Sequence, residues 1–250
     1  MNRFIIKYFT NPLWEFAAGR KTLSYLKELE KSQHWPLEKL EELQNQRLRA
    51  LLKHAYENVP YYRRVFRERK LKPEDVKDIH DLKKLPVLTK ELIAKNFDDM
   101  KVRNMDLFKP TLYRTGGSTG RPLVFYNAKK TFEYHLAAMY RAWKWIGFDF
   151  GSKYADLWGA TFDLKDEHKL KKRIHMWLTH NRLLVPSFRF TPEGLEKYSE
   201  QIVRFKPEYI HGYASSIEVM ADYMKKRGMS LEGVKGVITS GEKLFPHQRK

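Results

Sequence analysis

Apolar positions change their spacing about 110 residues into the chain. Before that point they recur at helical intervals, most clearly over residues 37–56, where Leu and Ala residues fall close to helical spacing. Pro60 ends this helix, because the residue before a proline disfavours the helical region, and a shorter helix follows over residues 61–70. A proline break and then Thr89 as a cap indicate another short helix. The pattern predicts a mainly helical section over residues 1–109.

From residue 110 onward, short apolar runs typical of strands alternate with helical stretches. Strands are predicted at residues 112–115, 123–126, 154–158, 182–185, 208–211 and 234–239. Helices are predicted at residues 131–146, 166–178, 191–205, 215–227 and from 245 on. Alternation of this kind implies parallel strands joined by helical crossovers. The predicted fold class is therefore α/β, with a mixed or parallel sheet flanked by helices in residues 110–250.

Composition favours a folded globular protein. Of the 250 residues, 42% are hydrophobic and 14% aromatic, whereas a disordered chain would be poor in both. The absence of cysteine excludes disulfides and thiolate-bound zinc, and it is compatible with a cytoplasmic location. No apolar run reaches the roughly 18 residues that a membrane span needs.

The net charge of +18 permits several anionic partners, namely nucleic acid, a membrane surface or small molecules. The excess is spread evenly, at +8 for residues 1–110 (24 basic, 16 acidic) and +10 for residues 111–250 (24 basic, 14 acidic). A basic nucleic-acid-binding module is the main alternative from another class. No recognised signature supports it, and aromatics such as Tyr134 and Trp143 fall at core-like spacing. We expect no specific nucleic-acid partner.

A glycine-rich loop at residues 114–122 joins two predicted strands. Three glycines expose backbone amides, hydroxyl groups and two arginines surround them, and such a loop suits a polyphosphate. It is not a Walker A loop, because no Gly-Lys-Ser/Thr leads into a helix, and Gly-x-Gly-x-x-Gly is absent. On these residues alone, a simple hairpin turn explains the loop equally well.

Four segments, taken in order, resemble one group of enzymes. Residues 115–123 resemble the Ser/Thr/Gly-rich phosphate loop of the adenylate-forming superfamily. His-Gly-Tyr-Ala-Ser-Ser at 211–216 resembles the strand-to-helix turn of CapK-type proteins, and Thr-Ser-Gly-Glu-Lys-Leu at 239–244 resembles the segment whose backbone contacts adenine. Residues 58–62 and 85–90 also look like the opening of this group. From about residue 40 onward, the chain is similar to the phenylacetate–CoA ligase and CapK subfamily.

The resemblance implies a reaction of a carboxylate with ATP to give an acyl-adenylate and pyrophosphate, often followed by transfer to coenzyme A. Arg121 stands where many members have Lys, and Gly117 where many have Ser or Thr. The implied phosphate-binding residues are Thr115, Gly116, Gly117, Ser118, Thr119, Gly120 and Arg121. The implied nucleotide neighbours are Ser240, Gly241 and Glu242, and the implied acyl-pocket residues are Trp158, Tyr213, Ala214 and Ser215.

Further motifs of that group come after the segment at 239–244. They include the glutamate that holds magnesium (Mg2+), the ribose-binding aspartate, and the C-terminal domain with the catalytic lysine. We therefore expect the N-terminal portion of such an enzyme, from a truncation, a split gene or a fragment, with a complementary C-terminal polypeptide as one partner. We predict that these 250 residues alone do not adenylate a carboxylate, and no catalytic residue is assigned.

Two other chemistries fit the sequence less well. A serine hydrolase would need Gly-x-Ser-x-Gly, which the turn before Ser215 lacks, so Ser215 or Ser216 is interpreted as a helix N-cap. His175 and His180 are five residues apart, which is not the i, i+4 spacing of two metal ligands on one helical face. They are interpreted as surface or core histidines, and no metal site is predicted.

Contact with a membrane surface is a third alternative. Aromatic and aliphatic residues crowd positions 4–16, and Arg3, Lys7, Arg20 and Lys21 flank them, as in a basic interfacial helix. Pro12 is expected to disrupt that helix, and packing onto the domain is the competing fate. The resemblance to a group linked with capsular polysaccharide synthesis suggests work near the inner membrane face.

Overall fold

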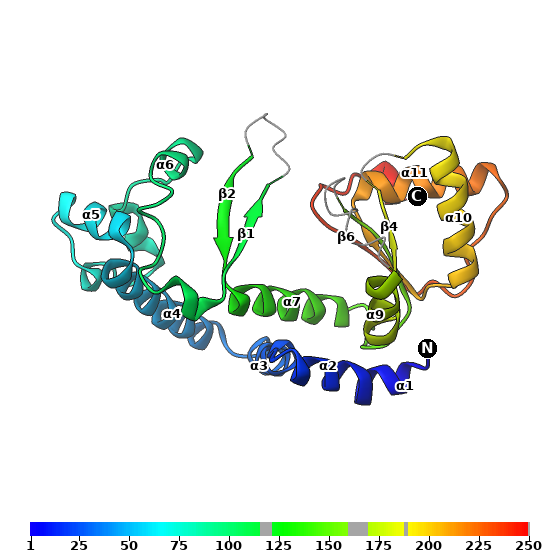
Figure 1. Ribbon diagram of the computed structural model, residues 1–250, viewed down its shortest axis with the longest axis horizontal. Helices are drawn as coiled ribbons and strands as arrows, with labels where there is room; N and C mark the ends of the chain where they lie inside the picture. The colour runs from blue at the N-terminus through cyan, green and yellow to red at the C-terminus, as the bar shows by residue number, and fades with distance from the viewer. Residues whose placement is uncertain (116–121, 160–169, 188–189, 250) are drawn as a thin grey trace. The chain divides into compact units, whose positions relative to one another are not determined.

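The computed structural model describes residues 1–115, 122–159, 170–187 and 190–249 (Figure 1). Packing divides the chain into two compact units, one formed by Met1–Leu23 with Ala138–Lys250, the other by Ser24–Ala137. This division joins the first 23 residues to the α/β part. The sequence-based division after residue 109 instead follows the change from helices to strands, which the structure has at residue 111.

The unit Ser24–Ala137 is mostly helical. Its α-helices are α3 (Thr22–Ser32), α4 (Leu37–Asn58), α5 (Pro60–Glu68), α6 (Lys90–Lys95) and the start of α7 (Lys129–Lys144), and its 3-10 helices are η2 (Pro73–Asp75), η3 (Ile79–Lys84) and η4 (Met105–Phe108). Its strands are β1 (Thr111–Arg114) and β2 (Val124–Asn127). Leu52, Phe66 and Val76 form one small core, and Val59, Tyr61 and Val65 form another. The predicted helix at 37–56 and the Thr89 cap, whose Oγ1 accepts from Leu92 N, are confirmed.

The other unit has a helical N-terminal run followed by alternating strands and helices. The run consists of α1 (Arg3–Ile5), the π-helix η1 (Ile6–Thr10) and α2 (Asn11–Ala17). The strands are β3 (Tyr154–Leu157), β4 (Arg182–Val185), β5 (Tyr209–Gly212) and β6 (Gly236–Thr239). The later helices are α9 (Leu170–His180), α10 (Pro192–Phe205), α11 (Ala214–Lys226) and the 3-10 helix η5 (Pro246–Arg249).

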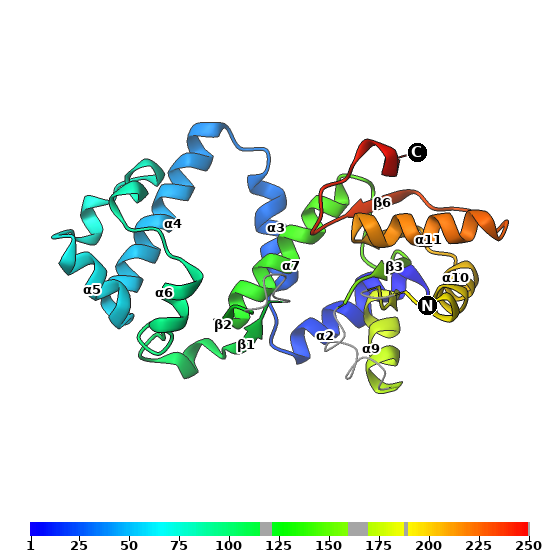
Figure 2. The same cartoon turned by 90° about the horizontal axis from the view of Figure 1, so that it is seen from above.

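The four strands form a parallel sheet in the order β4-β3-β5-β6, which confirms the predicted α/β class. Helices α10 and α11, side by side in Figure 2, pack on one face of the sheet. Their apolar side chains meet Ala155, Leu157 and Val185 there. On the other face, Trp143 at the end of α7 contacts Tyr154. The sheet is therefore covered on both faces, as parallel sheets usually are.

Candidate functional site

The carboxyl ends of three neighbouring strands bring most of the predicted nucleotide and acyl residues together. Trp158 follows β3, Tyr213 follows β5, and residues 240–242 follow β6. Because the strands are parallel, these segments meet at one edge of the sheet. In open α/β sheets, this is the edge where ligands bind.

An aromatic stack forms the centre of this edge. The rings of Trp158 and Tyr213 lie 4.3 Å apart, with only 11° between their planes, and Trp158 also stacks on His211 at 5.2 Å. Gly241 has φ of +77°, a conformation that side chains rarely adopt. A Cβ at that position would come within 2.8 Å of Tyr213 Cε1. The turn after β6 therefore presses its backbone against the stack, and only glycine fits there.

Three largely buried polar side chains, Asp156, Arg182 and His211, form a hydrogen-bonded group next to the stack. Asp156 on β3 accepts from Arg182 Nη2 at 2.7 Å and from His211 Nδ1 at 2.8 Å. The three side chains come from adjacent strands and are 8–17% exposed. Because the carboxylate accepts the Nδ1 proton, it fixes both the tautomer and the orientation of the ring that Trp158 covers. Burial also raises the pKa of nearby Tyr140 to about 12, so that phenol stays neutral.

Backbone hydrogen bonds tie the turn after β6 to the start of α11. Ser240 N donates to Gly212 O at 3.0 Å, and Ser215 N donates to Glu242 Oε2 at the same distance. An acidic side chain at a helix N-terminus satisfies an otherwise unpaired amide and meets the positive end of the helix dipole. The interpretation of Ser215 or Ser216 as the N-cap is wrong, because the cap position is Tyr213.

The remaining predicted site residues differ in their surroundings. Ser216 Oγ donates to Ser187 O at 3.4 Å, and Ala214 is buried, with only 2% of its surface exposed. Ser215 and residues 240–242 are exposed and accessible to a ligand.

Thr115 lies in the other compact unit, directly after β1, where the two strands of the β1–β2 hairpin lead into the connecting loop. Its amide donates to Leu123 O and its Oγ1 accepts from Leu123 N, both at 2.9 Å. These bonds continue the antiparallel register in which Arg114 pairs with Val124. Residues 116–121, which carry the other predicted phosphate contacts, lie outside the described residues.

The described histidines do not form a metal site. The His175 and His180 rings are 6.4 Å apart, and His175 packs against Trp14 at 4.2 Å. Burial, with a contribution from Arg182, lowers the pKa of His180 to about 3, so its imidazole is neutral. Among the residues that the structure describes, no group of three His, Asp or Glu side chains could hold a metal ion.

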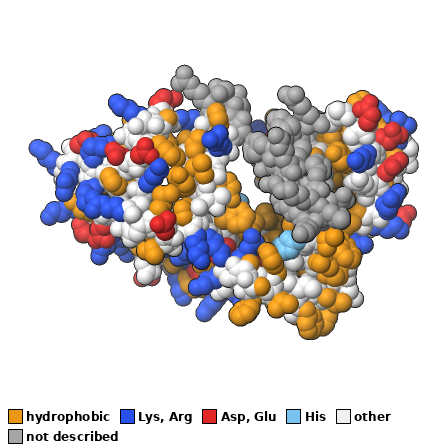
Figure 3. Space-filling model, viewed as in Figure 1, with side chains coloured by type: hydrophobic (Ala, Val, Ile, Leu, Met, Phe, Trp, Pro, Cys, Tyr) orange, Lys and Arg blue, Asp and Glu red, His pale blue; other side chains and the backbone are white. Residues whose placement is uncertain are grey.

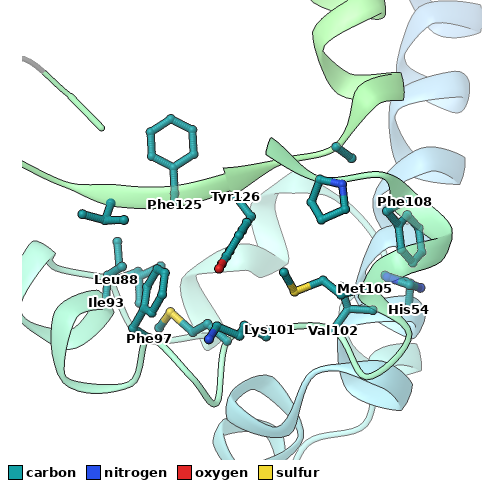
Figure 4. A pocket seen from close by; sticks show the side chains of 14 residues that line it. His54, Leu88, Ile93, Phe97, Lys101, Val102, Met105, Phe108, Phe125 and Tyr126 are labelled. Atoms are coloured by element: carbon teal, nitrogen blue, oxygen red, sulfur yellow. The ribbon is translucent and has the colours of Figure 1, made fainter. Parts of the chain in front are cut away.

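A separate apolar pocket of about 380 Å³ lies in the unit Ser24–Ala137 (Figure 4). The hairpin forms one wall through Phe125 and Tyr126, and Phe97 stacks on Tyr126 at 5.7 Å. Lys101 Nζ lies 5.8 Å from the centre of the Tyr126 ring and pairs with Asp98 at the rim. Its walls suit an apolar group better than a phosphate. No local sequence pattern predicts this pocket, because its lining residues are scattered from position 54 to 128.

The group formed by Asp156, Arg182 and His211 was likewise not predicted from the sequence. One signal was available: three polar residues stand in short runs that otherwise read as buried strands. Buried polar residues need partners, and neighbouring strands are the nearest source of them.

Solved structures with the same arrangement belong to acid–CoA ligases. An open conformation of 2-hydroxyisobutyryl-CoA ligase, in complex with its acyl-AMP and CoA, matches with a TM-score of 0.63 at 18% identity, covering 83% of this chain and 49% of that one. The same enzyme in its thioesterification state matches with a TM-score of 0.64 at 19% identity, covering 44% of that chain. This protein therefore shares the fold of part of that CoA ligase.

Sequence comparison finds curated relatives of two kinds, CapK and phenylacetate–CoA ligases. Protein CapK of Staphylococcus aureus is 26% identical over 217 residues, which are 86% of this chain and 47% of CapK. Phenylacetate–coenzyme A ligase of Escherichia coli K12 is 40% identical over 90 residues, 35% of this chain and 20% of the ligase. No protein-family profile matches the chain. The chain is related to the phenylacetate–CoA ligase and CapK branch of the adenylate-forming superfamily, and it spans less than half the length of these two relatives.

Proposed function

We propose that this chain is the nucleotide-binding N-terminal part of an adenylate-forming ligase. In that reaction a carboxylate oxygen attacks the α-phosphorus of ATP and pyrophosphate leaves. The thiol of an acceptor such as coenzyme A then attacks the acyl carbon of the adenylate, and AMP leaves. The observation that carries the proposal is the carboxyl edge of the sheet, where the Trp158–Tyr213 stack meets the backbone at Gly241.

The described residues fit the nucleoside end of the substrate. The exposed turn at 240–242 offers backbone groups to an adenine, and the adjoining stack offers a flat apolar surface. Asp156 and Arg182 keep His211 beneath the stack, so the surface is held in place before a ligand arrives. We infer that Trp158 and Tyr213 also border the acyl group, with Ala214 and Ser215 at the start of α11.

The phosphate contacts follow from the resemblance. Residues 115–121 supply amides, hydroxyls and one guanidinium, the donor set that suits a polyphosphate. We expect Mg2+ to be held by a glutamate outside these 250 residues. A cytoplasmic location and a link to capsular polysaccharide synthesis stay predictions of the resemblance.

Nucleotide binding is tested by thermal unfolding of the whole chain with AMP or ATP. At a ligand concentration ten times the dissociation constant, AMP should add about 1.4 kcal/mol of stability, whereas inorganic phosphate alone adds much less. Trp158→Leu should weaken AMP binding roughly ten-fold, because it removes half of the stack. Trp177→Leu, which changes a tryptophan of the same unit that is 46% exposed on α9, is the control. Equal AMP binding by both variants would falsify the placement of the site.

The alternative hypothesis, that the chain binds nucleic acid, predicts a different outcome in binding experiments. Tight binding to duplex DNA that falls steeply with salt, together with no shift from AMP, would replace the ligase proposal. A pyrophosphate-exchange assay with a panel of carboxylates separately tests the prediction that these 250 residues alone do not adenylate. Robust exchange would contradict it.

A further inference from the structure

The N-terminal helical run attaches to its unit through polar side chains. Thr10 Oγ1 donates to Leu178 O at 2.7 Å, and Asn11 Nδ2 donates to Thr179 O at 3.2 Å. These carbonyls belong to the last turn of α9, where the backbone has no partner within the helix. Asn11 is itself buried, so the run uses part of its polar side to dock.

Ionic contacts complete this attachment at the start of the run. Lys7 Nζ lies 2.6 Å and Arg3 Nη2 lies 3.2 Å from Asp149 Oδ2. Burial alone would raise the pKa of Asp149, but hydrogen bonds from Lys7, the Phe150 amide and Arg3 lower it below its usual value. The docked side also carries apolar side chains, since Ile6 is fully buried and Trp14 packs against His175.

The opposite side of the run is apolar and exposed. Figure 3 shows hydrophobic side chains gathered over the segment that Figure 1 labels α1 and α2. The rings cluster together, with Phe4 lying 4.7 Å from Tyr8 and 6.1 Å from Phe9. We name these side chains the aromatic row; they are 43–84% exposed and comprise Phe4, Ile5, Tyr8, Phe9, Leu13 and Phe16. A helix on a globular protein normally has the reverse orientation, with its apolar side inward.

The π-helix keeps the row on one side. A π-turn takes in one more residue than an α-turn, here through a bond from Asn11 N to Ile6 O. The extra residue brings Leu13 and Phe16 back into line with the residues before it. The expectation that Pro12 disrupts the helix is wrong, because Pro12 falls in the first turn of α2 and the run continues through it.

We propose that the aromatic row binds the interfacial layer of a lipid bilayer rich in anionic head groups. Aromatic and aliphatic side chains on one side of a helix, with basic residues beside them, suit this layer. Arg3 precedes the row, Arg20 and Lys21 follow it, and Lys7, which also pairs with Asp149, has its Nζ 5.2 Å from the centre of the Tyr8 ring. Glu15 is the one carboxylate in the sequence of residues 1–23, and it accepts a hydrogen bond from Leu23 N at 3.2 Å.

Charge also favours anionic lipid over a second copy of the chain as the partner of the aromatic row. At +18, two copies would repel each other across a surface flanked by basic residues, whereas anionic lipid attracts it. No helix among the described residues is long and apolar enough to cross a membrane. An exposed apolar row flanked by basic residues lies in the plane of the bilayer surface, with its aromatic rings at the boundary between head groups and acyl chains.

The test is co-sedimentation of the whole chain with phosphatidylcholine vesicles, with and without phosphatidylglycerol. We expect binding only when phosphatidylglycerol is present, weakened by salt. The variant Phe4→Ser, Phe9→Ser, Phe16→Ser should bind roughly ten-fold less tightly or worse. The matched control is Leu37→Ser, Val87→Ser, Leu107→Ser, which changes equally exposed apolar side chains in the other unit and should bind like the parent.

Circular dichroism and AMP binding should be unchanged in the aromatic-row variant, since its side chains face solvent and lie outside the nucleotide edge. Equal vesicle binding by both triple variants overturns the proposal, as does binding to neutral and anionic vesicles alike. Failure of the parent chain to bind any vesicle also overturns it. If the parent instead forms dimers that the aromatic-row variant abolishes, the row is a self-association surface.

Discussion

Replacing Gly241 by alanine tests whether the turn after β6 depends on glycine for two separate reasons. The first is conformational, because φ of +77° costs an alanine about 1 kcal/mol. The second is steric, because the new Cβ would lie 2.8 Å from Tyr213 Cε1 and the ring would have to move off Trp158. Disturbing an aromatic pair costs about 1 kcal/mol. We expect Gly241→Ala to lower the free energy of unfolding by about 2 kcal/mol.

The matched control is Gly228→Ala. Gly228 also has positive φ, at +65°, but a Cβ there would meet nothing within 4 Å, so only the conformational cost of about 1 kcal/mol applies. Urea unfolding followed by tryptophan fluorescence suits the comparison, because every tryptophan except Trp35 lies in the same unit as both glycines. In a Tyr213→Ala background the excess cost of Gly241→Ala should vanish. Equal losses from the two glycine variants in the parent chain would refute the steric argument.

Three further predictions concern polar residues of the same unit. Asp156→Ala should destabilise the chain by about 3–5 kcal/mol in urea unfolding, because it removes the carboxylate that pairs with the buried Arg182. A loss of stability no larger than that of an ordinary surface substitution would contradict this expectation. His180 binds its proton near pH 6.5 when unfolded but near 3 when folded, so the unfolded state gains protons as pH falls. Stability should drop by at most about 2 kcal/mol between pH 7 and pH 5, and His180→Gln should flatten that slope. Glu242→Ala should cost about 1 kcal/mol by leaving the first turn of α11 uncapped, and Glu242→Gln, which keeps an acceptor oxygen, should cost clearly less in the same measurement.

Local sequence signals located most of the secondary structure. The predicted helix at 191–205 is confirmed as α10; Thr191 caps it and Pro192 occupies its first turn, signals that depend only on neighbouring residues. The strand at 182–185 has the predicted bounds, since a short apolar run between turn residues is a local pattern as well. The parallel order of strands then followed from their alternation with helices.

Contacts between segments far apart in the sequence could not be predicted from these local signals, and only the packing of the folded chain determined them. Asp156, Arg182 and His211 meet because β4, β3 and β5 are neighbours in one register, a fact absent from any of the three segments. The side chain that accepts from the first turn of α11 is Glu242, which lies 27 residues beyond the Ser215 amide that it binds. A prediction based on neighbouring residues therefore chose the nearby serines, and it was wrong.

The N-terminal run shows the same limit. Its sequence showed crowded apolar residues with basic residues nearby, because composition is a local property, but Pro12 argued against a continuous helix there. Which side turns inward depended on Leu178 and Thr179, whose carbonyls accept hydrogen bonds from Thr10 and Asn11. Unpaired carbonyls at the end of α9 favour polar partners, and only the folded chain brings them to the run. That contact, with the π-turn, is why the aromatic side faces out.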